Sequence, residues 1–141
     1  MERQEWWQKI LCVIHNSHRK IQIYEETENV NHSELLALDI DSKSALGAIV
    51  SHTSGICIDN WIRVIGHDGA ERKGIIFYNK HKKEDGTFME GMLVIAQDIV
   101  GGIFAINQTK YDNGRNKIWY FAPDTLIWEC MDVNYFEFLN G

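Results

Sequence analysis

The clearest hydrophobic periodicity in the chain lies near its N-terminus. Large apolar residues recur there at helical spacing: Trp6, Ile10, Val13 and Ile14, with Trp7 and Leu11 beside them. This spacing places them along one side of a helix, so we expect a helix over residues 3–15 with that side buried. Ile21 and Ile23 then alternate with polar residues, which predicts a short strand or an extended arm.

A second, shorter helix is predicted to begin near Asn31. Asn31 can cap its first turn, and Glu34, three residues on, completes a capping box. Its apolar face would hold Leu35, Leu36 and Leu38. The polar residues 39–44 then bring in turn-forming side chains and end it.

Short apolar runs separated by turn signals fill the chain from Leu46 to Ala122. They predict strands at 46–50, 56–65, 74–78, 92–96, 103–106 and 118–122, with a bulge at Asp59-Asn60 inside the second of them. Glycine-containing turns between consecutive strands favour antiparallel neighbours. A last helix is expected from about residue 132–134, carrying Tyr135, Phe136, Phe138 and Leu139.

The pattern as a whole predicts an α+β fold. We expect one mainly antiparallel sheet of about five or six strands, packed by two or three helices. Because no linker, repeat or low-complexity segment interrupts the chain, residues 1–141 are expected to form a single domain. The expected core residues are Trp6, Ile10, Leu36, Ile49, Ile58, Ile62, Val64, Leu93, Ile95, Phe104, Ile106, Trp119 and Phe121.

The composition agrees with an ordinary globular core, and the net charge argues against one class of partner, nucleic acids. The chain is 45% hydrophobic and carries a net charge of −6, which argues against non-specific nucleic-acid binding. Residues 72–83 are a local exception, since five Lys and Arg residues surround Phe77 and Tyr78 there. Such charge runs are more often exposed hairpins, so we expect no nucleic-acid partner.

The sequence shows no signal peptide and no apolar run long enough to span a membrane. We therefore expect a cytoplasmic protein without a membrane partner. Its three cysteines, Cys12, Cys57 and Cys130, are odd in number, far apart and next to hydrophobic residues. That arrangement predicts reduced, buried thiols rather than disulfides.

Candidate catalytic and metal-binding groups are few. Cys12, His15 and His18 fall within about a turn of one helix, but a closed zinc site needs four ligands. Cys57 could pair with a histidine, yet it lies between Ile56 and Ile58, where a buried structural role is commoner. We therefore predict no catalytic residue, no metal and no cofactor.

Three carboxylates occupy turns or strand ends, namely Asp59, Asp98 and Asp124. They could converge in the folded chain, although hydrogen-bonding a turn is the commoner role of such aspartates. Gly101-Gly102 follows Asp98 without a phosphate-loop motif, which indicates a tight turn between strands.

Two stretches together resemble a bacterial family of unknown function. They are GAIV through TSGI to WIRVIG (47–66), and AQDIVGGIFAIN through WYFAPD to WE (96–129). The order of strand, Asp, Gly-Gly and strand, then strand and Pro-Asp, then Phe136 to Leu139, is more distantly similar to the SUKH superfamily. That resemblance implies an α+β domain, and many SUKH members are immunity proteins that neutralise bacterial toxins. The family continues into a further helical segment, so we expect a chain ending at Gly141 to be shortened or to associate.

Two functions remain open from the sequence. The first is a protein-binding module of the immunity type, whose acidic residues attract a basic partner such as a toxin. Its candidate contact residues are Glu25, Glu26, Glu28, Asp39 and Asp41. The alternative is a hydrolase or small-ligand-binding enzyme that uses Asp59, Asp98 and a histidine in a sheet-edge pocket. A flat acidic face would favour the first function, and carboxylates converging in a deep pocket would favour the second.

Overall fold

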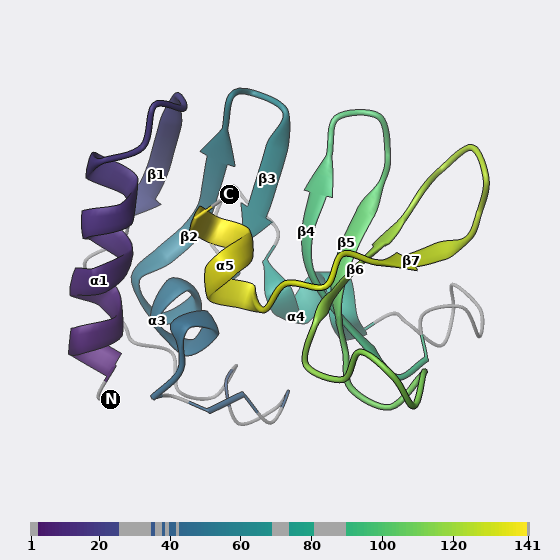
Figure 1. The fold of residues 1–141 in the computed structure, drawn as a ribbon. Helices are drawn as coiled ribbons and strands as arrows, with labels where there is room; N and C mark the ends of the chain where they lie inside the picture. Colours follow the sequence, from purple (N-terminus) through teal and green to yellow (C-terminus); the bar gives the residue numbers. More distant parts are fainter. Residues whose placement is uncertain are drawn as a thin grey trace.

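The computed structural model describes residues 3–25, 35, 38, 40–41, 43–68, 74–80 and 90–140. Seven strands form one sheet in the order β1-β2-β3-β4-β5-β6-β7, and every neighbouring pair is antiparallel (Figure 1). The predicted α+β fold with a mainly antiparallel sheet is confirmed. The strands are β1 (Ile21–Glu25), β2 (Thr53–Ile58), β3 (Ile62–Ile65), β4 (Met92–Asp98), β5 (Ile103–Asn107), β6 (Ile118–Phe121) and β7 (Trp128–Cys130).

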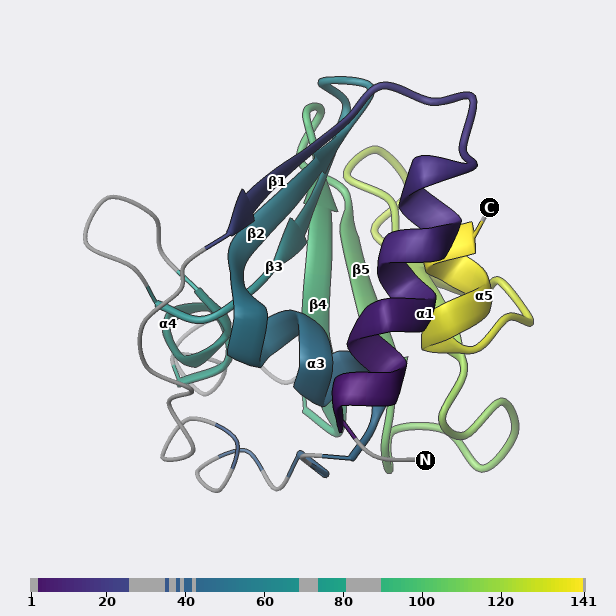
Figure 2. The ribbon, with the colours of Figure 1, turned by 90° about the vertical axis from the view of Figure 1, so that its left-hand side faces the viewer.

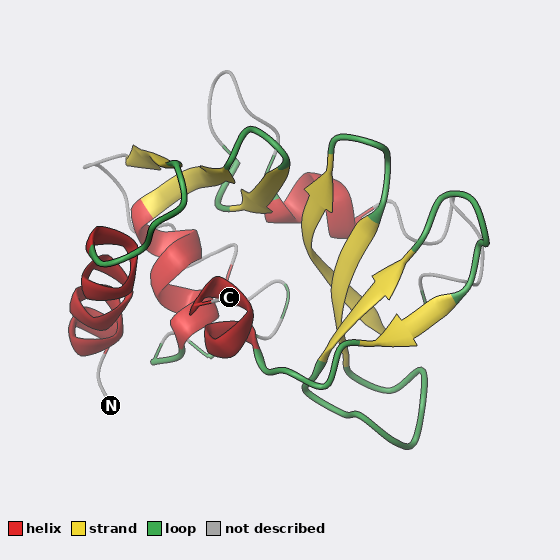
Figure 3. Cartoon of the chain, turned by 45° about the horizontal axis from the view of Figure 1, so that its top comes forward, coloured by secondary structure: helices red, strands yellow, loops and turns green. Residues whose placement is uncertain are grey.

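Helices lie on both sides of this sheet. The described helices are α1 (Arg3–His15), α3 (Ala45–His52), α4 (Ile75–Lys80) and α5 (Tyr135–Asn140). Helices α1, α3 and α5 contact one another and lie on one side, whereas α4 lies on the other side beside β4 (Figures 2 and 3). None of the described helices is long and apolar enough to cross a membrane.

The predicted first and last helices are both present. Helix α1 buries Trp7 and Ile10, while Trp6 is only partly buried and packs on Phe136 with 5.6 Å between ring centroids. Helix α5 begins with a capping box: the backbone N–H of Asn134 donates to Glu137 Oε1 (2.9 Å), and the N–H of Glu137 donates to Asn134 Oδ1 (2.8 Å).

The strand predicted at 46–50 is wrong, because these residues belong to helix α3. The Ser44 hydroxyl caps the helix by accepting the N–H of Gly47 at 3.0 Å. Every residue from Ala45 to Ser51 is buried. A helix buried on all sides has no polar stripe, so its sequence lacks the periodicity that would have distinguished it from a buried strand.

The strand predicted at 74–78 is also wrong, since Ile75–Lys80 form helix α4. The buried side chain of Asn79 joins this helix to the sheet: its amide nitrogen donates to the Val94 carbonyl (2.9 Å), and its oxygen accepts the Val94 N–H (2.8 Å). These two bonds occupy backbone groups of β4 that would otherwise pair with a neighbouring strand.

The single strand predicted over 56–65 is two strands, β2 and β3, and Asp59-Asn60 is the turn between them rather than a bulge. The short strand β7 was not predicted. Predicted strands at 92–96, 103–106 and 118–122 are confirmed as β4, β5 and β6. The helix expected from Asn31 lies mostly outside the described residues, although Leu35 is described and buried.

The core is one cluster of buried residues from the sheet, from α1, α3 and α5, and from α4 on the other side, which contributes Ile75. Most of the predicted core is buried there, whereas Trp6, Ile62, Ile106 and Phe121 are only partly buried, and Leu36 lies outside the described residues. The prediction of buried cysteines is wrong: the thiols are free, but Cys12 and Cys130 are exposed and Cys57 is half-buried. Cys12 occupies the solvent side of α1, and Cys130 ends the edge strand β7.

Candidate binding surface at the hairpin tips

The order of the strands brings three turns to one end of the molecule. In an antiparallel sheet whose strands follow chain order, alternate connections lie at the same end. The β2–β3, β4–β5 and β6–β7 connections therefore lie together, at the top of Figure 1, beside the start of β1. The opposite end carries α3, α4 and the residues that join β5 to β6.

These three turns expose large apolar side chains. Trp61 is 51% exposed, Ile99 67%, Val100 56%, Leu126 65% and Ile127 58%. We call these five residues the hairpin-tip surface. Among the described residues only Phe77 and Met131 are comparably exposed large hydrophobics. A concentration of exposed apolar residues at one end of a domain is typical of an interaction site.

The β2–β3 turn is set by two residues in the left-handed region. Asp59 and Asn60 have φ values of 54° and 56°, and the N–H of Trp61 donates to the Ile58 carbonyl at 2.9 Å. Two consecutive positive φ values give a type I′ turn, which suits a twisted hairpin. The turn leaves Trp61 on its outer side, directly before Ile62.

Asp59 also ties this turn to the start of β1. Its carboxylate accepts the backbone N–H of Lys20 at 2.8 Å and a guanidinium N–H of Arg19 at 2.9 Å. The bond from Lys20, and after it the bond from Arg19, lower the pKa of Asp59. The carboxylate therefore serves as an acceptor that fixes the backbone.

The β4–β5 turn is held by Asp98, whose carboxylate accepts backbone N–H groups of the turn itself. Its Oδ1 accepts the N–H groups of Gly102 (2.7 Å) and Val100 (3.2 Å), and its Oδ2 accepts the Tyr120 hydroxyl at 2.6 Å. The N–H of Ile99 donates to the Trp61 carbonyl at 2.9 Å, which joins this turn to the β2–β3 turn. The two apices are thereby fixed relative to each other.

Tyr120 lies directly against Gly102. A Cβ at position 102 would collide with the Tyr120 phenol, so glycine is required for this approach. Burial, and then the hydrogen bond to Asp98, raise the pKa of Tyr120 to about 12. The hydroxyl therefore stays protonated and donates a hydrogen bond to Asp98 across the turn.

The β6–β7 turn carries the third aspartate. Asp124 Oδ1 accepts the N–H of Thr125 at 2.9 Å, and the N–H of Leu126 donates to the Ala122 carbonyl at 2.9 Å. Leu126 has a φ of 57°, in the left-handed region that non-glycine residues seldom adopt. This backbone holds Leu126 and Ile127 exposed at the apex.

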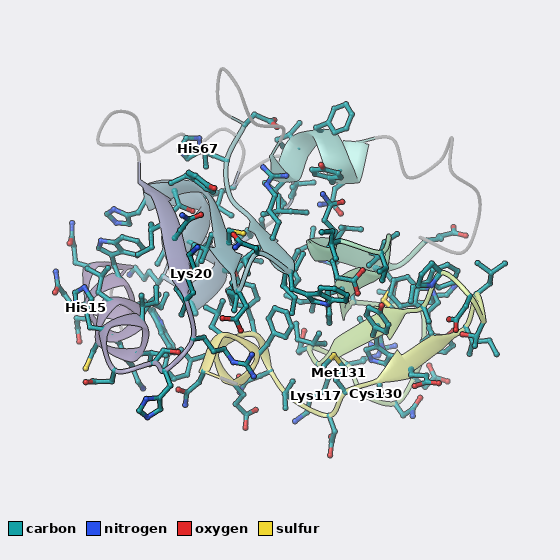
Figure 4. All side chains as sticks on the ribbon, turned by 90° about the horizontal axis from the view of Figure 1, so that it is seen from above. His15, Lys20, His67, Lys117, Cys130 and Met131 are labelled. Carbon is teal, nitrogen blue, oxygen red and sulfur yellow. The ribbon has the colours of Figure 1, made fainter. Side chains whose placement is uncertain are left out.

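The three aspartates therefore lie at one end of the sheet: Asp98 and Asp124 hydrogen-bond their own turns, and Asp59 hydrogen-bonds the start of β1. Hydrogen-bonding a turn is the commoner role expected from the sequence. Within the described part of the chain, no group of three His, Cys, Asp or Glu residues could hold a metal ion. Cys57 pairs in register with Arg63 and not with a histidine, and His15 and His67 lie well apart (Figure 4).

Of the predicted acidic set, the structure describes only Glu25 and Asp41. Glu26, Glu28 and Asp39 lie outside the described residues. Glu25 ends β1 opposite Thr53, and the exposed Asp41 accepts the Lys43 N–H at 2.9 Å shortly before α3. Since Ile21, at the other end of β1, is the residue that pairs next to the tips, Glu25 lies at the end of the sheet away from the hairpin-tip surface.

Sequence reasoning missed the hairpin-tip surface, although a signal for it was present. Each apex places large apolar residues within three positions after a turn aspartate: Asp59 and Trp61, Asp98 and Ile99-Val100, Asp124 and Leu126-Ile127. Turn positions are ordinarily polar, so apolar residues there run against the usual pattern. Assigning residues 56–65 to one strand concealed the first of these apices.

The sequence also matches a known family over nearly its whole length. Residues 1–140 match the family described as "Protein of unknown function DUF2625". The chain belongs to the DUF2625 family. This is a family of unknown function, so membership assigns no activity to the chain. The resemblance to the SUKH superfamily stays a prediction.

Two curated relatives of this DUF2625 chain are bacterial. One, an uncharacterized protein of Haemophilus influenzae, is 28% identical over 137 residues, which cover 94% of this chain and 60% of the relative. The other, the putative uncharacterized protein YbfG of Escherichia coli, is 34% identical over 124 residues, 78% of this chain and 56% of the relative. The chain thus spans somewhat more than half the length of each.

Proposed function

We propose that this DUF2625 domain is a protein-binding module that acts by stoichiometric binding, with the hairpin-tip surface as its contact. The supporting observation is that five exposed large apolar residues gather in three turns at one end of the sheet. Tryptophan is enriched among the residues that dominate binding energy at interfaces. Turns fixed by aspartate hydrogen bonds also lose little entropy on binding.

A finer proposal concerns the partner's charge and role. The net charge of −6 and the acidic residues near Glu25 support a basic partner, since opposite charges speed association. Together with the distant resemblance to the SUKH superfamily, this supports an immunity-type role against a basic toxin. In that proposal the hairpin-tip surface supplies affinity and the acidic residues supply steering.

The proposal is tested by affinity capture with a matched control. The tagged full chain, the tip variant Trp61→Ser/Ile99→Ser/Leu126→Ser and the control Phe77→Ser are each incubated with lysate of the source bacterium. Phe77 is an exposed aromatic residue on α4, away from the tips. We expect a protein that wild type and control retain at 1:1 stoichiometry by native mass spectrometry, and that the tip variant loses by at least about tenfold.

Three results would contradict the proposal. The tip variant could retain the same proteins as wild type. The hairpin-tip surface could instead bind phosphatidylcholine or phosphatidylglycerol vesicles, in a manner that the tip variant abolishes. Sedimentation could show a dimer that the tip variant dissociates, which would make the surface a contact between copies of this chain.

A further inference from the structure

A groove of about 260 Å³ opens beside the β2–β3 turn. Its walls are mainly apolar and come from the sheet, from α5 and from the residues just before α5: Ile58, Ile62, Phe104, Val133, Phe138 and Leu139. Ile58 and Ile62 are the register pair that closes the turn, and Ile62 directly follows Trp61. The groove therefore begins at the residue that follows Trp61 of the hairpin-tip surface.

The charges near the groove are compensated, with one exception. Arg19 is bound to Asp59 at 2.9 Å, and Lys117 lies 4.0 Å from Asp132. Glu137 lines the groove, and its carboxylate accepts the Asn134 N–H. No cation of the described residues lies within ion-pair distance of Glu137. The groove is thus mainly apolar, and of its two charged lining residues Arg19 is paired with Asp59, whereas Glu137 has no described cation as a partner.

We propose that this groove receives one large apolar side chain of the protein partner, next to a Lys or Arg that pairs with Glu137. This inference rests on the proposed function. The volume is below the roughly 300–1,000 Å³ of typical small-molecule sites, so it suits a single side chain. An apolar anchor in a pocket, with charged groups around it, is the usual arrangement at the centre of a protein interface.

Two small probes of matched shape test the chemistry of the groove. 3-Phenylpropylammonium and 3-phenylpropanoate share an apolar body and differ in the sign of their charge. Each is titrated into the isotope-labelled full chain and followed by NMR. We expect the cation to shift the signals of Ile62 and Phe138 saturably and to bind about threefold more tightly than the anion, because an exposed ion pair contributes modestly.

Two kinds of variant locate the site. Glu137→Gln should remove the preference for the cation and leave the binding of the apolar body, whereas Ile62→Trp or Val133→Phe should fill the groove and abolish binding of both probes. If the filling variants fail to fold, the inference is tested by comparing the preference for the cationic probe in wild type and in Glu137→Gln. Equal binding of the two probes to wild type, or no shift at groove residues, would overturn the inference.

The occupant is tested on the captured partner. Ile62→Trp, checked for folding by circular dichroism, should weaken that partner's binding by at least about tenfold. A dimer of the chain that Ile62→Trp dissociates would overturn the inference, because the occupant would then be a second copy. A partner lost by the tip variant but retained by Ile62→Trp would refute the groove alone and leave the proposed function intact.

Discussion

At both ends of the sheet a polar side chain holds a loop, but the two ends differ in whether the large apolar residues of that loop are covered. At the end opposite the tips, the buried amide of Asn107 organises the loop after β5: its nitrogen donates to the carbonyls of Tyr111 (2.9 Å) and Asn113 (3.0 Å). The ring of Tyr111 then folds back and stacks on Trp119, with centroids 4.4 Å apart. At the tip end, Asp98 organises its turn just as closely, yet Ile99 and Val100 point into solvent.

This comparison shows that turn geometry alone does not force apolar residues outward. A side chain that fixes a loop is present at both ends, but only one end covers its large apolar groups. The exposed apolar side chains at the apices therefore add little to the buried core and are available for binding.

Trp119→Ala should cost the most stability. Trp119 is buried, stacks on Tyr111 and donates its indole N–H to the Gly114 carbonyl at 3.0 Å. Removing a buried aromatic side chain costs about 3–5 kcal/mol. Urea unfolding followed by circular dichroism measures the loss, and a midpoint close to that of wild type would show that this end does not depend on Trp119.

Asp98→Ala should destabilise the chain by about 2 kcal/mol, because the Gly102 N–H and the Tyr120 hydroxyl lose a charged acceptor. The matched control is Asp124→Ala, which removes one hydrogen bond from an exposed turn and should cost less than about 1 kcal/mol. The same urea titration compares them. An equal loss of unfolding free energy in the two variants would contradict the role of Asp98 as the acceptor for Gly102 and Tyr120.

Tyr120 should make stability fall at high pH. Its pKa is raised to about 12, whereas an unfolded tyrosine titrates near 10. Between about pH 10 and 12 the unfolded chain releases this proton and the folded chain keeps it, so the free energy of unfolding decreases as pH rises. Tyr120→Phe should flatten this decrease, and an unchanged slope would argue against the raised pKa.

Much of this architecture could be predicted from the sequence, and the failures have physical causes. Helix α1 carries a helical periodicity, and β4 to β6 are short apolar runs of strand length between turn signals, so their positions were predicted. Helix α3 is buried on all sides and α4 begins with two isoleucines, so neither has an amphipathic pattern that distinguishes it from a strand.

The candidate site was predicted in its parts but not in its arrangement. The turn role of Asp98 and Asp124 follows from local chemistry and was expected, whereas Asp59 bonds the distant residues Arg19 and Lys20. The placement of the three aspartates at one end depends on the chain-order sheet, which requires β2 and β3 to be separate strands. The exposure of Trp61 follows from the positive φ values of Asp59 and Asn60, which the sequence pattern did not distinguish from a bulge.

Removing acidic charge at Glu25 and in the residues that follow it should change only association. Replacing Glu25, Glu26 and Glu28 by Gln should slow the association of a basic partner several-fold at low salt and leave its dissociation rate nearly unchanged. Surface plasmon resonance at two salt concentrations measures both rates. An association rate that ignores both salt and these substitutions would remove the acidic residues from the proposed contact.

Trp61→Ala should have the smallest effect on stability, within about 0.5 kcal/mol, because the side chain is half exposed and lies at the turn apex. Urea unfolding beside Trp119→Ala gives the direct contrast between the two tryptophans. A cost above about 2 kcal/mol would mean that Trp61 belongs to the folding core.

Hydroxyl-radical footprinting of the domain, alone and in complex with its captured partner, tests the central claim most directly. If the hairpin-tip surface is the contact, oxidation of Trp61, Ile99 and Leu126 should fall at least about threefold in the complex, since core interface residues lose nearly all solvent contact. Oxidation of Phe77 on α4 should stay unchanged. Protection of Phe77 with Trp61 still fully reactive would contradict the account and place the binding surface on the other side of the sheet.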